Sequence, residues 1–327
     1  MAKIEEKDRE NENLKNEQKK LNSIDGYFKK VVLISTLLFF VCTAFAQKNS
    51  EKTGSLLWKI SGNGLTQPSY IFGTHHLFPL SFLDSVAGLK QAFSACKQVV
   101  GELAMQDMLA LSNEVQVAGM MPQDTTWQML LSEADYRFVD EKLTAVFGTG
   151  LQTFGMFKPA MVSMSYVVAF YQSMFPQTDD ATPPDIWFQQ EAVKKEMPVV
   201  GLETVQEQIF AIFGFASLKR QAADFVCALK NTDYTLRTLV KLNNLYRSAD
   251  LNGVAKMFKE KSPCPSNGEQ EKVINTARNK QWLKKLPAIM KEKPSFIAVG
   301  MMHLAGKDGL LHGLEQAGYT VEAVVTE

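Results

Sequence analysis

The stretch "YIFGTHHLFP", residues 70–79, places two adjacent histidines directly after an apolar run that ends in Gly73-Thr74. The chain of 327 residues contains four histidines, and His303 follows a second apolar run, in "FIAVGMMHLAG", with the same Gly-x-x-His spacing. Short, continuous apolar runs are typical of strands that helices cover on both faces. The repeated phrase therefore predicts two related strand–helix units, each with a histidine just beyond the end of its strand.

The rest of the chain extends this plan. A hairpin is expected in "SLLWKISGNGLTQPSYIFGT", with its turn at Asn63-Gly64. A helix is expected over residues 82–96, capped by Ser81 or Asp84. The segment from about 105 to 195 has mostly helical patterns, and "SFIAVGMMHLAGKDGLLHGLEQAGYTVEAVV" reads as strand, helix and strand. We predict an α/β fold with one domain over residues 47–327, in which two strand–helix–strand units form a central sheet around a helical insertion.

Two further short strands end in glutamates, "VVGEL" at Glu102 and "VVGLE" at Glu203. Ligands of open α/β sheets bind beyond the carboxyl ends of the strands. On this topology His76, His303 and the two glutamates lie at one edge of the sheet. Imidazole and carboxylate donors suit Zn²⁺, Mn²⁺, Fe²⁺ or Co²⁺, so the pattern favours a metal-activated water with a carboxylate as general base. A structural role for either glutamate remains open.

Roles for individual residues follow from their local context. Glu102 is expected to act as a general base or a labile ligand. Glu203 starts a helix whose dipole should depress its pKa, so it is expected to be a structural carboxylate or a partner of Arg278 or a histidine. Arg278 could orient a carboxylate, stabilise an oxyanion or be a solvated helix charge. Asp185, after two prolines, is most simply a helix N-cap.

Two histidines stand apart from the repeated phrase. His75 should point away from His76, because neighbouring residues on a strand or tight turn face opposite ways. His312 lies among polar residues of a predicted helix. Both are expected to have structural roles.

Composition excludes several classes of function. Lys plus Arg and Asp plus Glu each number 35, so no field of one sign indicates a nucleic-acid partner. The sequence has no Gly-x-Ser-x-Gly elbow, no Walker loop and no His-Glu-x-x-His helix. A serine or cysteine nucleophile is therefore not expected.

The N-terminal segments indicate export. Residues 1–30 are charged and nearly free of apolar side chains, so they should be disordered. Residues 31–46, "VVLISTLLFFVCTAFA", follow two lysines and end in a small-x-small pattern, which predicts a signal peptide cleaved after Ala46 and an extracytoplasmic protein. The alternative is a membrane anchor left uncleaved. In the mature chain we expect a Cys227–Cys264 disulfide and a buried Cys96.

These motifs, taken in order with "VVGLETVQEQ" and "ARNKQW", resemble the TraB/GumN family over about residues 54–326. That group includes the Tiki metalloproteases and PrgY. The resemblance implies a fold like that of erythromycin esterases and ChaN, and a divalent-metal peptidase acting on peptides or protein N-termini, with Mn²⁺ or Co²⁺ as activator and Zn²⁺ as another option. It implies metal ligands at His76, His303, Glu102 and Glu203, and catalytic roles for Glu102 and Arg278. His75 departs from the pattern, because an apolar residue is usual there, and a role as an additional ligand is the alternative to a structural one. A non-catalytic protein that sequesters a peptide or haem is the alternative function.

Overall fold

The computed structural model describes residues 54–104, 106, 108–176, 182–257, 259–264 and 272–325. The predicted disordered segment, signal peptide and cleavage site lie outside these residues. Within them, no helix combines the length and the apolar content needed to cross a bilayer.

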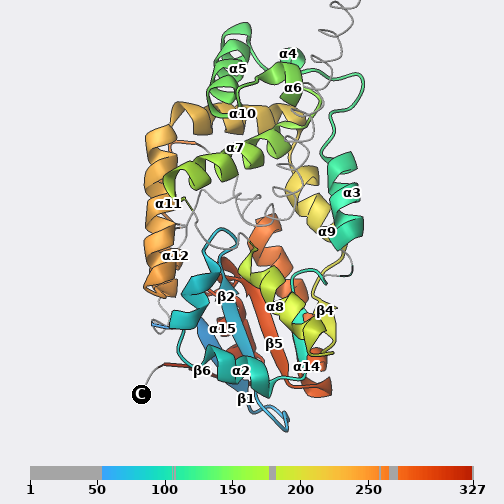
Figure 1. The fold of residues 1–327 in the computed structure, drawn as a ribbon, viewed down its shortest axis with the longest axis vertical. Helices are drawn as coiled ribbons and strands as arrows, with labels where there is room; N and C mark the ends of the chain where they lie inside the picture. The colour runs from blue at the N-terminus through green and yellow to red at the C-terminus, as the bar shows by residue number, and fades with distance from the viewer. Residues whose placement is uncertain are drawn as a thin grey trace, which may run out of the picture.

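A six-stranded mixed sheet forms the lower part of the molecule in Figure 1, in the order β4-β3-β5-β2-β1-β6. Its strands are β1 Leu57–Ser61, β2 Ser69–Thr74, β3 Gln98–Gly101, β4 Val199–Gly201, β5 Ser295–Gly300 and β6 Thr320–Ala323. The four strands β4, β3, β5 and β2 are mutually parallel, whereas β1 runs antiparallel to β2 and to β6. The α/β class predicted from the sequence is confirmed at this level.

The predicted hairpin joins β1 to β2. Its turn contains Asn63 at φ 48° and Gly64 at φ 80°, two left-handed conformations that asparagine and glycine tolerate. The expected helix over 82–96 is wrong in its detail. The chain instead forms a 3₁₀ turn, η1 Leu80–Ser85, and then α2 Leu89–Ala95, whose N-cap is Gly88 rather than Ser81 or Asp84. Gly88 adopts φ 70°, so the chain turns sharply there and the helix begins only afterwards.

Helices cover both faces of the sheet. The connections β2–α2–β3 and β5–α15–β6 cross the sheet in opposite directions, and right-handed crossovers then place their helices on opposite faces. Phe188 of α8 Pro184–Lys194 packs on Phe72 and Phe296, with ring centroids 5.6 and 4.7 Å away, and α8 lies in front of the sheet in Figure 1. The last part of the described chain adds η4 Lys272–Thr276, α14 Ala277–Glu292, η5 Met301–His303 and α15 Leu310–Gln316.

A second layer, wholly helical, lies above the sheet in Figure 1. It consists of α3 Met108–Ala118, α4 Trp127–Leu130, α5 Glu133–Phe147, α6 Leu151–Phe154, α7 Pro159–Met174, α9 Val205–Ile209, η3 Phe210–Gly214, α10 Leu218–Lys230, α11 Thr232–Arg247 and α12 Leu251–Met257. Ten of the 16 residues of α7 are buried. One hydrophobic cluster contains the buried strand residues together with Tyr246 of α11 and Val254 of α12, so these two helices also pack on the sheet. A second cluster lies mostly among the other helices of this layer, and a small third cluster includes Leu77 and Tyr171.

One disulfide, Cys227–Cys264, ties the end of α10 to a loop, and Cys96 is a buried free thiol. Both features were predicted. Disulfides are typical of proteins that fold in oxidising compartments.

Candidate functional site

The carboxyl ends of four parallel strands bring the predicted residues to one edge of the sheet. Gly101 of β3 pairs with Gly201 of β4, and Thr74 of β2 pairs with Gly300 of β5. Glu102 and Glu203 follow the first pair, and His76 and His303 follow the second. All four side chains are at most 7% exposed. The register of the sheet therefore sets the positions of these residues.

Gly73, the first residue of the Gly-x-x-His phrase, allows the two histidine segments to approach each other. A Cβ placed on Gly73 would lie 2.8 Å from Cβ and 2.9 Å from Cα of Met301, two residues before His303. Both are closer than real Cβ contacts allow, and one of them is to the backbone. The glycine is thus required by the packing of one phrase on the other.

Arg278 is the centre of the cluster. Its guanidinium donates to Glu203 through Nε at 2.8 Å and Nη2 at 2.6 Å, and to Glu102 through Nη2 at 2.6 Å. Nη1 donates to the Ile274 carbonyl at 3.1 Å and lies 3.3 Å from Nε2 of His303. Every guanidinium nitrogen is therefore engaged, and a residue that could have been a solvated helix charge is a buried bridge between two carboxylates.

The two glutamates differ in their electrostatics. Burial opposes ionisation of Glu102, but Arg278, the two histidines and the Gly300 N–H, at 3.0 Å, lower the pKa of Glu102 to about 2. Burial raises the pKa of Glu203, and Arg278 opposes that rise. The expectation that a helix dipole depresses the pKa of Glu203 is wrong, because desolvation is the larger effect and α9, after the Thr204 cap, is only five residues long.

His303 is held as a neutral imidazole of defined tautomer. Asn279 uses its Nδ2 to donate to the carbonyls of His303 and Asp308, at 3.2 and 2.8 Å, so its Oδ1 faces Nδ1 of His303, at 2.7 Å, as an acceptor. Nδ1 therefore carries the proton and Nε2 is the basic nitrogen. Burial lowers the pKa of His303 to about 3. Trp282, whose ring centroid lies 4.4 Å from the imidazole, completes its surroundings.

His76 has the opposite electrostatic environment. Its Nδ1 lies 2.5 Å from Oδ1 of Asp185, near the start of α8. Burial favours the neutral ring, but Asp185 and, more weakly, Glu102 raise the pKa of His76 above its ordinary value. Asp185 was expected to be an N-cap. That is wrong, because Pro183 is the N-cap of α8 and the Asp185 carboxylate, half-buried, pairs with His76 instead.

Asp185, Asn279 and Trp282 are therefore residues that sequence reasoning missed. Asn279 and Trp282 follow Arg278 by one and four residues, so one face of α14 carries all three, and the 3.6-residue helical period could have indicated this. Asp185 gives no such signal, because its partner is 109 positions away along the chain.

His75 lies on the other side of the histidine pair, as predicted. It packs against Phe78, Tyr171 and Tyr246, with ring centroids 5.3 to 5.8 Å away, and its Nδ1 accepts a hydrogen bond from the N–H of Leu77. Burial, and then the charge of His76, lower the pKa of His75 to about 3. His312, half-buried on α15, is not among the contacts of the cluster.

Three of the four predicted metal ligands have surroundings that suit the binding of a divalent cation. His76 and His303 each have Nδ1 bound to a side-chain oxygen, the arrangement usual for metal-ligating histidines, and Glu102 lies 3.8 Å from Nε2 of His303. Glu203 fits less well, because Arg278 and Gln208 engage its oxygens. Among the described residues, no three His, Cys, Asp or Glu side chains are already arranged around one ion position.

Buried polar atoms without a hydrogen-bond partner also gather in the segments that carry the cluster. Within the described structure they include Thr74 Oγ1, Gln208 Oε1, Asn275 Oδ1 and Trp282 Nε1. Buried polar groups are nearly always paired with protein or water, and these four atoms belong to residues close in sequence to His76, Glu203 and Arg278.

Comparison with known proteins identifies the family. The sequence profile of the TraB/PrgY/gumN family matches residues 56–323, and the chain belongs to this family. No curated protein and no solved structure matches the chain significantly.

The low pKa of His75 predicts an acid-sensitive fold. The unfolded chain takes up a proton at this residue near pH 6.5, whereas the folded chain does so only near pH 3, so stability is lost as the pH falls through this window. Between pH 6.5 and 5 the loss due to His75 should be about 1.6 kcal/mol. We expect urea unfolding of His75→Asn to show a dependence on pH that is weaker by this amount.

Tyr171→Phe is the control. It removes a hydrogen bond to Asn243 in the same cluster, and no group that titrates in this window is changed, since burial raises the pKa of Tyr171 to about 12. This variant should lose stability equally at both pH values. If wild type and His75→Asn lose the same free energy of unfolding between pH 6.5 and 5, His75 is not held neutral by the fold.

Proposed function

We propose that this protein is a metal-dependent hydrolase that cleaves peptide bonds, with His76, His303 and Glu102 holding the metal ion. The observation that carries the proposal is the pair of buried imidazoles whose Nδ1 atoms are each held by a side-chain oxygen, Asp185 for one and Asn279 for the other. This arrangement fixes the ring orientation and leaves Nε2 of each histidine as the nitrogen that would coordinate an ion. At His303 the ion would replace the 3.3 Å contact of Nε2 with Nη1 of Arg278. The resemblance of the motifs to metallopeptidases supports peptide bonds as the substrate.

The chain's own residues have separate tasks in this proposal. Glu102, whose pKa is about 2, is ionised throughout the physiological range, so it suits a ligand or a fixed negative charge better than a general base. Arg278 positions Glu102 and Glu203 and supplies a buried positive charge beside any oxyanion formed at this edge. A bound divalent ion would supply Lewis-acid activation of water or of the scissile carbonyl.

Glu203 is the remaining carboxylate. Its pKa is raised, which moves it toward the range in which a carboxylate accepts a proton efficiently. Its oxygens are engaged by Arg278 and Gln208, so its first task is to hold the guanidinium. The proposal therefore assigns Glu203 a positioning role.

We also propose that the protein is exported. The apolar segment over residues 31–46 supports this, as does the Cys227–Cys264 disulfide, because such bonds persist in oxidising compartments. Mn²⁺, Co²⁺ and Zn²⁺ are the candidate ions for such a donor set.

The proposed function predicts paired losses of metal and activity. We expect purified residues 47–327 to cleave members of a peptide library when Mn²⁺, Co²⁺ or Zn²⁺ is added. His76→Ala and His303→Ala should each lose the bound ion in elemental analysis and lose cleavage, because each removes one imidazole ligand. His312→Ala is the matched control and should keep both, since His312 is not among the contacts of the cluster.

Two outcomes would contradict the proposal. Retention of stoichiometric metal by both His76→Ala and His303→Ala would place the ion elsewhere. Absence of cleavage with every metal, together with tight binding of a peptide or of haem, would instead favour a sequestering protein of the same fold.

Glutamine variants distinguish the two glutamates. Glu102→Gln should lower turnover by a factor of about 10² or more, because it removes the ionised oxygen from the centre of the site. Glu203→Gln should mainly destabilise the fold, by about 3 kcal/mol, because it removes one charge of a buried ion pair with Arg278. Turnover per folded molecule and urea unfolding measure the two effects, and full turnover in Glu102→Gln would transfer the leading role to Glu203.

Export predicts a defined N-terminus. The cellular protein should begin near Gln47 and lie outside the cytoplasm, because the small-x-small pattern ends at Ala46. N-terminal sequencing of the protein from fractionated cells measures this. An intact 31–46 segment in the membrane fraction would show an anchored protein instead.

A further inference from the structure

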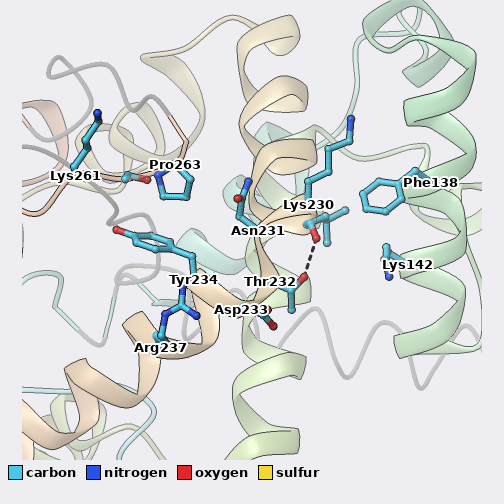
Figure 2. Close-up of a pocket in the computed structure, with 12 residues that line it drawn as sticks. Phe138, Lys142, Lys230, Asn231, Thr232, Asp233, Tyr234, Arg237, Lys261 and Pro263 are labelled. Atoms are coloured by element: carbon cyan, nitrogen blue, oxygen red, sulfur yellow. Dashed lines mark hydrogen bonds between the residues drawn. The ribbon is translucent and has the colours of Figure 1, made fainter.

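A pocket of about 820 Å³ opens on the helical layer, in a part of the molecule that contributes no residue to the site described above. Its walls come from α5, from the corner between α10 and α11, and from the loop that precedes Cys264, as Figure 2 shows. The lining residues are Phe138, Lys142, Leu229, Lys230, Asn231, Thr232, Asp233, Tyr234, Arg237, Lys261, Ser262 and Pro263. A volume of this size is typical of ligand-binding sites.

The charge of the pocket is strongly one-sided. Four of the lining side chains are cationic and only Asp233 is anionic, although the whole chain has a formal net charge of zero. Lys230 is paired with Asp135 at 2.6 Å. Within the described residues, no carboxylate lies within 4.0 Å of the charged nitrogens of Lys142, Arg237 or Lys261. Within this part of the chain, three positive charges of the pocket therefore have no anionic partner.

Apolar surface alternates with these charges. Nζ of Lys142 and of Lys230 lie 5.5 and 5.9 Å from the centroid of Phe138, so the ring lies between two cations. On the opposite wall, Tyr234 lies between Arg237 and the Lys261–Pro263 loop (Figure 2). A ligand here can place apolar groups on Phe138 and Tyr234 and anionic groups beside the neighbouring cations.

The disulfide fixes one wall of the pocket. Cys264 follows Pro263 directly and is bonded to Cys227 of α10, and Asn231 at the corner donates to the Cys227 carbonyl at 2.9 Å. The bond therefore holds the loop that carries Lys261 against the helices that carry Lys230 and Arg237. A wall held in place before binding reduces the conformational entropy that a ligand must overcome.

The positions of the cations decide which anion fits. In Figure 2 the side chains of Lys142, Arg237 and Lys261 lie at separate places around the pocket and do not converge on one point. A compact ion such as phosphate would contact only a few of them. An extended chain with several carboxylates spaced by apolar side chains would contact all of them. We propose that this pocket is a docking site for an acidic peptide segment.

The docking site is inferred from the geometry of the pocket, so it does not depend on whether the protein hydrolyses peptides. The probe is a fluorescein-labelled ten-residue peptide in which glutamate alternates with leucine and phenylalanine, and fluorescence anisotropy measures its binding with a chelator present to prevent cleavage. Wild-type protein should bind this peptide, more weakly as salt rises. It should not bind the matched peptide with glutamine in place of glutamate.

Charge reversal locates the site. Arg237→Glu combined with Lys261→Glu should weaken binding by about tenfold or more, because two exposed cations become anions beside the ligand. The control, Lys219→Glu combined with Lys256→Glu, makes the same change in net charge at exposed lysines that do not line the pocket and should change the Kd by less than about twofold. Circular dichroism confirms that all forms are folded.

Three results would overturn the proposal: no binding of the acidic peptide at low salt, equal binding of the glutamine peptide, or equal loss in both double variants. Stronger binding of inorganic pyrophosphate than of the peptide, measured by displacement, would overturn the assignment of the ligand as a peptide. If the wild-type protein binds the acidic peptide but cleaves no peptide with any added metal, the proposed function is contradicted and the docking site is not.

Discussion

The buried contact of Arg278 with Glu102 and Glu203 is the interaction on which the rest of the site depends. Three charged groups are at most 8% exposed, and removing any one leaves a buried charge with too few partners. Such clusters rarely add stability compared with apolar side chains of the same volume. The guanidinium instead holds helix α14 against the ends of β3 and β4, so that the carboxylates and the imidazoles lie at the same edge of the sheet.

The same helix determines the state of His303. Arg278, Asn279 and Trp282 lie on one face of α14 and contact, respectively, Nε2, Nδ1 and the ring face of this imidazole. Burial lowers the pKa of both histidines, and at His76 the Asp185 carboxylate on Nδ1 outweighs burial and raises the pKa, whereas the neutral Asn279 amide on Nδ1 of His303 supplies no such charge. Two histidines introduced by the same short phrase thus have different chemistry, and the difference comes entirely from residues outside the phrase.

Much of the sheet and its edge could be predicted from the sequence because the signals are local. Apolar runs that end in glycine mark β2, β3, β4 and β5, and the residue after each run falls at the edge whatever lies between the strands. The contacts of Asp185 and the opposing pKa shifts of the glutamates could not be predicted. They depend on burial and on distances between segments far apart in the chain, which no pattern within one segment contains. The metal ligands remain a prediction.

The adjacent histidines contact different parts of the structure. His76 contacts Asp185 on the sheet layer, while His75 packs against Tyr171 of α7 and Tyr246 of α11 in the helical layer. An apolar side chain would fill the aromatic cluster equally well, yet it could not accept the hydrogen bond from the Leu77 N–H that closes the turn. One peptide bond therefore separates a residue of the site from a residue of the helical packing.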